Sequence, residues 1–152
     1  MKFATTVATA MLVASSAVAA EAPRIIAIHA QLYHEGSGKL SAEDLLAPDA
    51  PGMWNTIIGD NASNFTLVTV EVQGKDVPVG AVKVQLVARG YKRRIMEQRT
   101  IDVSLYDAKT TFFAPLWLYD TGCDEIEVSA RLIGKGVSGP TVKKVIPFKC
   151  GE

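Results

Sequence analysis

The two histidines of the chain, His29 and His34, are the first side chains to consider for chemistry. Imidazole is a common metal ligand and the usual acid–base group near neutral pH. The two residues are five positions apart, so on one continuous strand they face opposite sides. They can reach one metal ion only where the chain bends before His34, and Met53 could then add a thioether sulfur. His29, His34 and Met53 are therefore candidate metal ligands, against the alternative of one strand-end and one solvated histidine.

Catalytic and cofactor motifs are not recognisable along the chain. The sequence has no G-x-S-x-G nucleophile elbow and no Walker phosphate loop. Gly134-Lys135-Gly136 is expected in a hairpin loop, with no following helix to bind phosphate. Glu125 and Glu127 are expected to share one strand face, where Lys143 or Lys144 of the following strand could balance their charge. That pattern is typical of a solvated face. The sequence therefore predicts a non-enzymatic protein without a cofactor.

A dense basic cluster and an apolar, aromatic segment are the features most suited to binding. The cluster surrounds a turn at Gly90, so its cations are expected to project from one end of the domain with an aromatic ring among them. The segment from Phe112 to Tyr119 cannot bury all its large side chains on one strand face, so a bulge at Pro115 turns them inward or some remain exposed. The candidate partner-binding residues are Arg89, Tyr91, Lys92, Arg93, Arg94 and Trp117. The alternatives are a soluble hairpin and a packed core.

The first twenty residues have the layout of a bacterial-type secretory signal peptide. Lys2 gives a positive start, a short apolar run follows, and small residues lead to Ala20. The run is too short for a membrane span. We expect cleavage to leave residues 21–152 as a single domain in the periplasm or medium, with no other transmembrane segment. That domain carries 15 basic and 16 acidic side chains, a balance that disfavours bulk binding to nucleic acid.

Two cysteines, Cys123 and Cys150, remain in the expected exported chain. An oxidising compartment favours one disulfide between them. The bridge would close a loop of about 28 residues and contribute about 3–4 kcal/mol in the chain-entropy model. A redox pair or a thiolate metal site is the alternative, but redox pairs usually have the spacing Cys-x-x-Cys at a helix start, whereas these cysteines are 27 positions apart on expected strands.

Alternating apolar and polar residues dominate the chain from Phe65 onward and predict strands. Val68, Val70 and Val72 share one face, and later segments repeat the pattern between turn signals. One short helix is expected early, with Ser41 as its N-cap. About seven strands with hardly any helix predict an all-β antiparallel sandwich of immunoglobulin-like architecture, with a barrel as the alternative.

These observations lead to two hypotheses for function. The first is an exported, non-enzymatic module that contacts another envelope or secreted protein, or the cell envelope itself. The second is a periplasmic carrier of a small ligand or metal, which would use the histidines and the Met53 segment. A fold class alone cannot decide between them.

Overall fold

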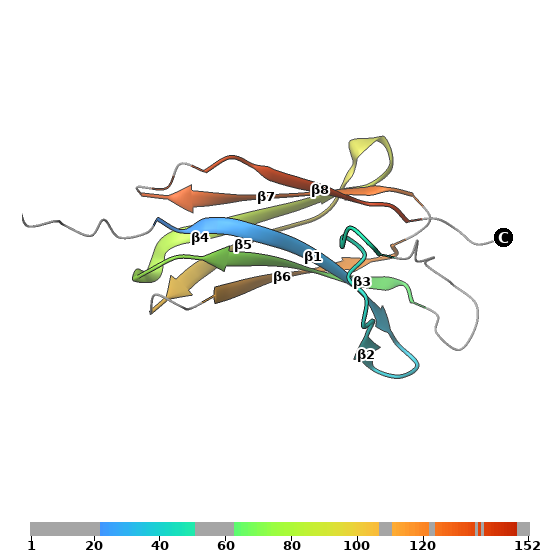
Figure 1. Cartoon of the computed structure of the whole chain (residues 1–152). Coiled ribbons are helices and arrows are strands. Elements are labelled where there is room, and N and C mark those ends of the chain that lie inside the picture. Colours follow the sequence, from blue (N-terminus) through green and yellow to red (C-terminus); the bar gives the residue numbers. More distant parts are fainter. Residues whose placement is uncertain are drawn as a thin grey trace, which may run out of the picture.

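The computed structural model of the chain describes residues 22–50, 63–106, 111–121, 124–135, 137 and 139–148, and these form two antiparallel sheets packed face to face (Figure 1). The first sheet has the order β2-β1-β3-β6, with strands Lys39–Leu40, Arg24–His34, Phe65–Gln73 and Thr111–Tyr119. The second has the order β5-β4-β7-β8, with strands Ile95–Leu105, Val77–Arg89, Ile126–Gly134 and Val142–Ile146.

The path of the chain between the sheets is that of an immunoglobulin-like sandwich. It leaves the first sheet after β3, returns for β6 and crosses again to β7 and β8, so that β4 lies between β5 and β7. Seven strands carry this pattern, and the two-residue β2 extends the first sheet beside β1. The described residues include no helix long and apolar enough to cross a membrane. The prediction of an all-β sandwich is confirmed.

Alternation along the strands builds the core between the sheets. In β3 the even-numbered residues Val68, Val70 and Val72 have no exposed surface, while their odd-numbered neighbours are partly exposed. The same pattern holds in β4, β6 and β7. Burial of an aliphatic side chain contributes about 1.5–3 kcal/mol, so the inward faces give the main favourable term in folding.

Two details of the strand pairing follow the sequence. Pro115 lies in β6, an edge strand of its sheet, where a residue without an amide hydrogen is tolerated, and the β3–β6 register continues through it without a bulge. The β7–β8 hairpin also pairs without a bulge, with Ile126 opposite Ile146.

The short helix expected after Ser41 is wrong: residues 41–50 form turns instead. The Ser41 hydroxyl accepts a hydrogen bond from the Leu32 amide at 3.1 Å and donates one to the Glu43 carbonyl at 2.9 Å. The Leu45 amide donates to the Ala30 carbonyl at 2.7 Å. The polar groups that would cap a helix therefore bond to the backbone of β1. Residues 41–50 follow β2 along the same edge of β1.

Gly134 ends β7 with a φ of 151° and lies against the neighbouring strand. A Cβ there would collide with the Ala81 carbonyl oxygen. We predict that Gly134→Ala lowers the free energy of unfolding by about 1–3 kcal/mol, because it combines a disfavoured φ with a backbone clash. Urea unfolding measures the change. Gly139→Ala is the matched control, since a Cβ at Gly139 has open space; equal effects at both positions would contradict the account.

Candidate functional sites

His29 lies on the outer face of the first sheet between two carboxylates. Its Nδ1 is 2.7 Å from Asp44 Oδ2, and its Nε2 is 3.4 Å from Glu71 Oε2. Asp44 Oδ1 also accepts hydrogen bonds from the amides of Ala30 at 2.8 Å and Leu46 at 3.0 Å. The cluster therefore ties the turn segment 41–50 to β1, and this fastening is a structural role.

The electrostatics of this cluster favour the charged forms of both partners. Burial lowers the pKa of His29, but the hydrogen bonds and charges of Asp44 and Glu71 outweigh it and raise that pKa above 6.5. Burial raises the pKa of Asp44, and the amides of Ala30 and Leu46 together with His29 bring it below 3.8. The pair is therefore an imidazolium and a carboxylate in mildly acidic solution.

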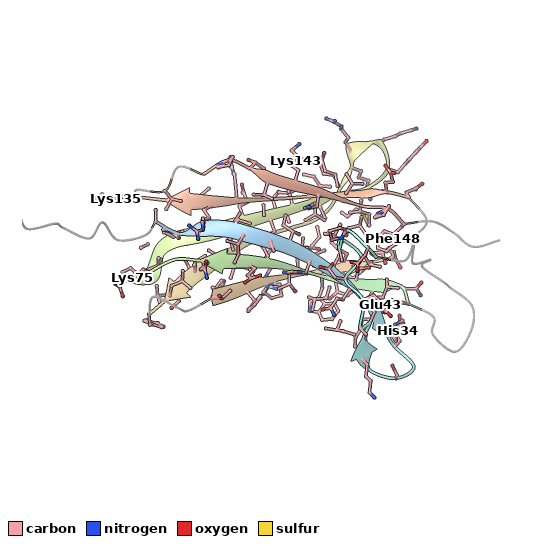
Figure 2. The ribbon with its side chains drawn as sticks, viewed as in Figure 1. His34, Glu43, Lys75, Lys135, Lys143 and Phe148 are labelled. Atoms are coloured by element: carbon pink, nitrogen blue, oxygen red, sulfur yellow. The ribbon has the colours of Figure 1, made fainter. Side chains whose placement is uncertain are left out.

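The candidate metal ligands are not brought together. His34 ends β1 opposite Lys39, at the β2 end of the sandwich (Figure 2), five strand residues and about 16 Å from His29. Both ring nitrogens of His29 face carboxylates. Met53 lies outside the described residues. Within the described ranges no group of three or more histidine, cysteine or acidic side chains is arranged to hold a metal ion.

Four aromatic side chains form a contacting cluster on the outer face of the first sheet, which we call the aromatic face: Tyr33, Phe65, Trp117 and Tyr119. Tyr33, Phe65 and Tyr119 are paired in one row across β1, β3 and β6. The rings of Tyr33 and Trp117 meet edge to face at 5.6 Å, although β3 separates their strands. The Phe65 ring contacts Tyr33 at 6.5 Å and Tyr119 at 5.3 Å. Such pairs contribute about 0.5–1.5 kcal/mol each and hold the rings in fixed positions.

The exposure of these rings shows which large side chains between Phe112 and Tyr119 are buried and which face outward. Leu116 and Leu118 point into the core, whereas Trp117 is half-buried on the outer face and Tyr119 is 57% exposed. No bulge turns them inward. Tyr33 and Phe65 were missed in the sequence as members of this cluster, although each has the same parity as the outward residues of its strand.

The outer face of the second sheet has a different chemistry. Lys83 pairs with Asp102 and Lys143 pairs with Glu127, each at 3.2 Å. These contacts match the solvated face expected from the alternation around Glu127. One outer face of the sandwich is therefore polar and paired, and the other carries a cluster of aromatic rings.

The basic cluster forms the exposed turn between β4 and β5, which we call the basic turn (residues 89–94). Tyr91–Arg93 is a single 3-10 turn with Lys92 Nζ 5.0 Å from the centre of the Tyr91 ring. Lys92 and Arg93 have φ values of 52° and 61°, a left-handed conformation that costs a non-glycine residue about 1–2 kcal/mol. The aromatic face and the basic turn lie at the same end of the sandwich, because the turn between β4 and β5 is drawn at the end where β3 begins and β6 ends (Figure 1). Tyr91 and Tyr119 line one pocket there.

A groove of about 500 Å³ lies between the basic turn and the ends of β6 and β7. Its apolar floor includes Met96, which packs so closely on Gly90 that a Cβ there would come within 2.7 Å of the sulfur. Tyr119 belongs both to this groove and to the aromatic face. The complete lining, among the described residues, is Gly90, Tyr91, Arg94, Ile95, Met96, Tyr119, Asp120, Asp124 and Ile126.

Cys123 and Cys150, the expected disulfide, lie outside the described residues. The β7–β8 hairpin that they flank is formed, and its last pair is Ile126 opposite Ile146. The cysteines are three and four residues beyond that pair in the sequence. The disulfide stays a prediction.

No protein-family model matches the chain, and no curated protein matches it. Among solved structures, it resembles a putative β-galactosidase from Bacteroides fragilis, with a TM-score of 0.38, 15% identity and coverage of 53% of this chain and 13% of that one. It also resembles a Bifidobacterium dentium β-glucuronidase complexed with coumarin-3-O-glucuronide, with a TM-score of 0.46, 10% identity and coverage of 83% and 18%. The chain thus spans less than a fifth of either protein. These similarities are too low to bear on function.

The His29 cluster predicts a pH-dependent stability. Since folding raises the pKa of His29, its stabilisation is complete below pH 6.5 and is lost as the pH rises through the folded-state value. Asp44 behaves in the opposite sense, and its stabilisation is present above pH 3.8 and is lost as the pH falls through its lowered value. We predict that His29→Gln costs more stability at pH 5.5 than at pH 9 in denaturant unfolding. A cost that stays the same between these pH values would contradict this explanation, and so would a pH dependence that is not reduced in Asp44→Asn, where only Glu71 still raises the pKa of His29.

In the basic turn, by contrast, we expect two substitutions that stabilise the protein. Lys92→Gly and Arg93→Gly should each raise the free energy of unfolding by about 0.5–1 kcal/mol, since glycine relieves the left-handed strain at a smaller entropic cost. Arg94→Gly removes the same charge at an extended residue, with φ −62° and ψ 132°, and should not stabilise the protein. Thermal and urea unfolding compare the three variants. Equal effects at all three positions would show that charge, rather than backbone conformation, governs the turn.

Proposed function

We propose that this protein is an exported, non-enzymatic β-sandwich module that binds another component of the cell envelope, with the aromatic face as its contact surface. The aromatic face is the observation that carries the proposal. Aromatic rings held in fixed positions lose little side-chain entropy on binding, and they are enriched among the residues that dominate interface energies.

The difference between the outer faces of the two sheets supports the aromatic face as the contact surface. Lys83 and Lys143 on the second sheet already have ionic partners. The first sheet instead exposes more than half of Phe113 and Tyr119. An aromatic cluster on one face of a small domain is typical of an interaction surface.

The non-enzymatic part of the proposal is supported by the role of the His29 cluster. Asp44 uses one carboxylate oxygen on two backbone amides and the other on His29. These contacts fasten a turn segment to β1, and the imidazole, held by Asp44 and Glu71, acts as a structural cation. Export is supported by the signal-like residues 1–20 and by the two cysteines.

The alternative function of a small-ligand carrier keeps one supporting observation, the groove beside the basic turn. Its lining mixes apolar, aromatic and charged side chains, as small-molecule sites do. The two functions are compatible, because a binding module can hold a small ligand beside its partner surface.

The test measures binding of the protein, purified from its own extracytoplasmic fraction, to envelope fractions of the same cells. Trp117→Ala and Tyr119→Lys should weaken saturable binding by about 30-fold, the effect of an interface residue worth about 2 kcal/mol. Tyr119→Lys changes an exposed side chain and is expected to leave folding intact, so it covers the case in which Trp117→Ala unfolds.

Tyr106→Lys is the matched control, because Tyr106 is 73% exposed at the other end of the sandwich. It makes the same substitution away from the aromatic face and should bind as the unchanged protein does. Equal loss in Tyr119→Lys and Tyr106→Lys, or no loss in folded Trp117→Ala, is the result that rejects the aromatic face as the contact surface. Recovery of the protein only from the cytoplasm would reject export.

A further inference from the structure

The groove beside the basic turn carries opposite charges on its two walls. The wall formed by the basic turn contributes Arg94, and the wall formed by the ends of β6 and β7 contributes Asp120 and Asp124. Among the described residues, none of these three side chains makes an ion pair or a side-chain hydrogen bond. The groove therefore holds a guanidinium and two carboxylates that are free to take a ligand of both signs.

Two tyrosine rings add a preference for a soft organic cation. Tyr91 stands on the basic wall, and Tyr119 stands on the acidic one. The Tyr91 ring already attracts an ammonium, that of Lys92 at 5.0 Å. Aromatic faces next to carboxylates are the usual environment for quaternary ammonium groups, whose weak hydration makes them easy to bury.

Backbone strain is concentrated around the same groove. Four non-glycine residues of the described part have positive φ, and three of them flank it: Lys92 and Arg93 beside one wall and Asp120 in the other. Such conformations are uncommon for residues other than glycine and gather at functional sites. Glycine would remove the strain at each position, but it would also remove the charge.

We propose that this groove binds a small zwitterion of the phosphocholine type. Arg94 would bond to the phosphate, since a guanidinium matches phosphate oxygens with two parallel hydrogen bonds. Asp120 and Asp124, with the ring of Tyr119, would receive the quaternary ammonium. The floor of Ile95, Met96 and Ile126 would contact the ligand's methyl and methylene groups. This site does not depend on the proposed partner contact of the aromatic face, with which it shares only Tyr119.

The experiment is a titration of the isotopically labelled protein with phosphocholine, followed by amide chemical shifts. Choline chloride and inorganic phosphate are titrated separately under the same conditions. We expect saturable shifts at residues of both walls, with phosphocholine bound at least about tenfold more tightly than either half alone, since each end adds a charge-assisted contact. If inorganic phosphate bound as tightly as phosphocholine, the site would be only a basic patch. If choline bound as tightly as phosphocholine, Arg94 would have no role in binding. Either result, or the lack of saturable shifts with phosphocholine, would overturn the proposal.

Paired variants locate the site. Arg94→Gln and Asp124→Asn should each weaken phosphocholine binding by about tenfold. Their matched controls, Arg99→Gln and Asp76→Asn, make the same charge changes outside the groove and should bind normally. Folded Arg94→Gln or Asp124→Asn that binds as the unchanged protein does would reject the assignment.

Two further arms identify the source of the ligand and separate this proposal from the aromatic face. Co-sedimentation with phosphatidylcholine vesicles, lost in Arg94→Gln, would assign the headgroup to a lipid, whereas binding of free phosphocholine alone would assign it to a solute. Trp117→Ala should keep phosphocholine binding whether or not it loses the envelope fraction. Loss of phosphocholine binding in folded Trp117→Ala would count against a separate groove site.

Discussion

Every second residue along the inner strands β3, β4 and β7 must enter the narrow space between the two sheets, and the rest of the structure depends on this constraint. Val68 and Val70 of β3 belong to one core cluster with the inward residues of β4 and β7, and all of these side chains are buried. Once these positions face inward, their neighbours must face outward, because successive strand residues alternate. The outward position of Trp117 is therefore a consequence of burying Leu116 and Leu118. The alternation that places residues in the core therefore also determines which residues form the aromatic face.

The antiparallel register carries this constraint to the end of the sandwich. Tyr33, Phe65 and Tyr119 share one row because β1, β3 and β6 pair without a shift in that region. The same end receives the basic turn, since β4 runs toward it and β5 leaves from it (Figure 1). Surfaces far apart in the sequence thus become adjacent, and the groove joins the basic turn to the end of β6. The strained residues lie in the turns, where no sheet hydrogen bonds are broken by a left-handed backbone.

Much of this fold was predictable from the period of two in the sequence. The inward sets of β3, β4 and β7 agree with the faces expected from alternation, because each strand buries one side only. The helix expected at Ser41 was wrong because the side chain that would cap a helix can also bond to the backbone of a strand edge. Here the Ser41 hydroxyl bonds to the Leu32 amide of β1, and this tertiary contact replaces the helix. Clusters that join distant strands were not predictable. The meeting of Tyr33 with Trp117, and of His29 with Glu71, requires the sheet order β1-β3-β6, which local pattern does not specify.

Hydroxyl-radical footprinting tests most directly whether the aromatic face is a partner surface in its native setting. The protein is labelled once in purified form and once in intact envelope preparations, and modification is read by mass spectrometry at single residues. We expect Trp117 and Tyr119 to be labelled in the purified protein and protected in the envelope, and Tyr106 to be labelled equally in both. Equal labelling of Trp117 in the two settings would contradict the proposal that this face binds an envelope component.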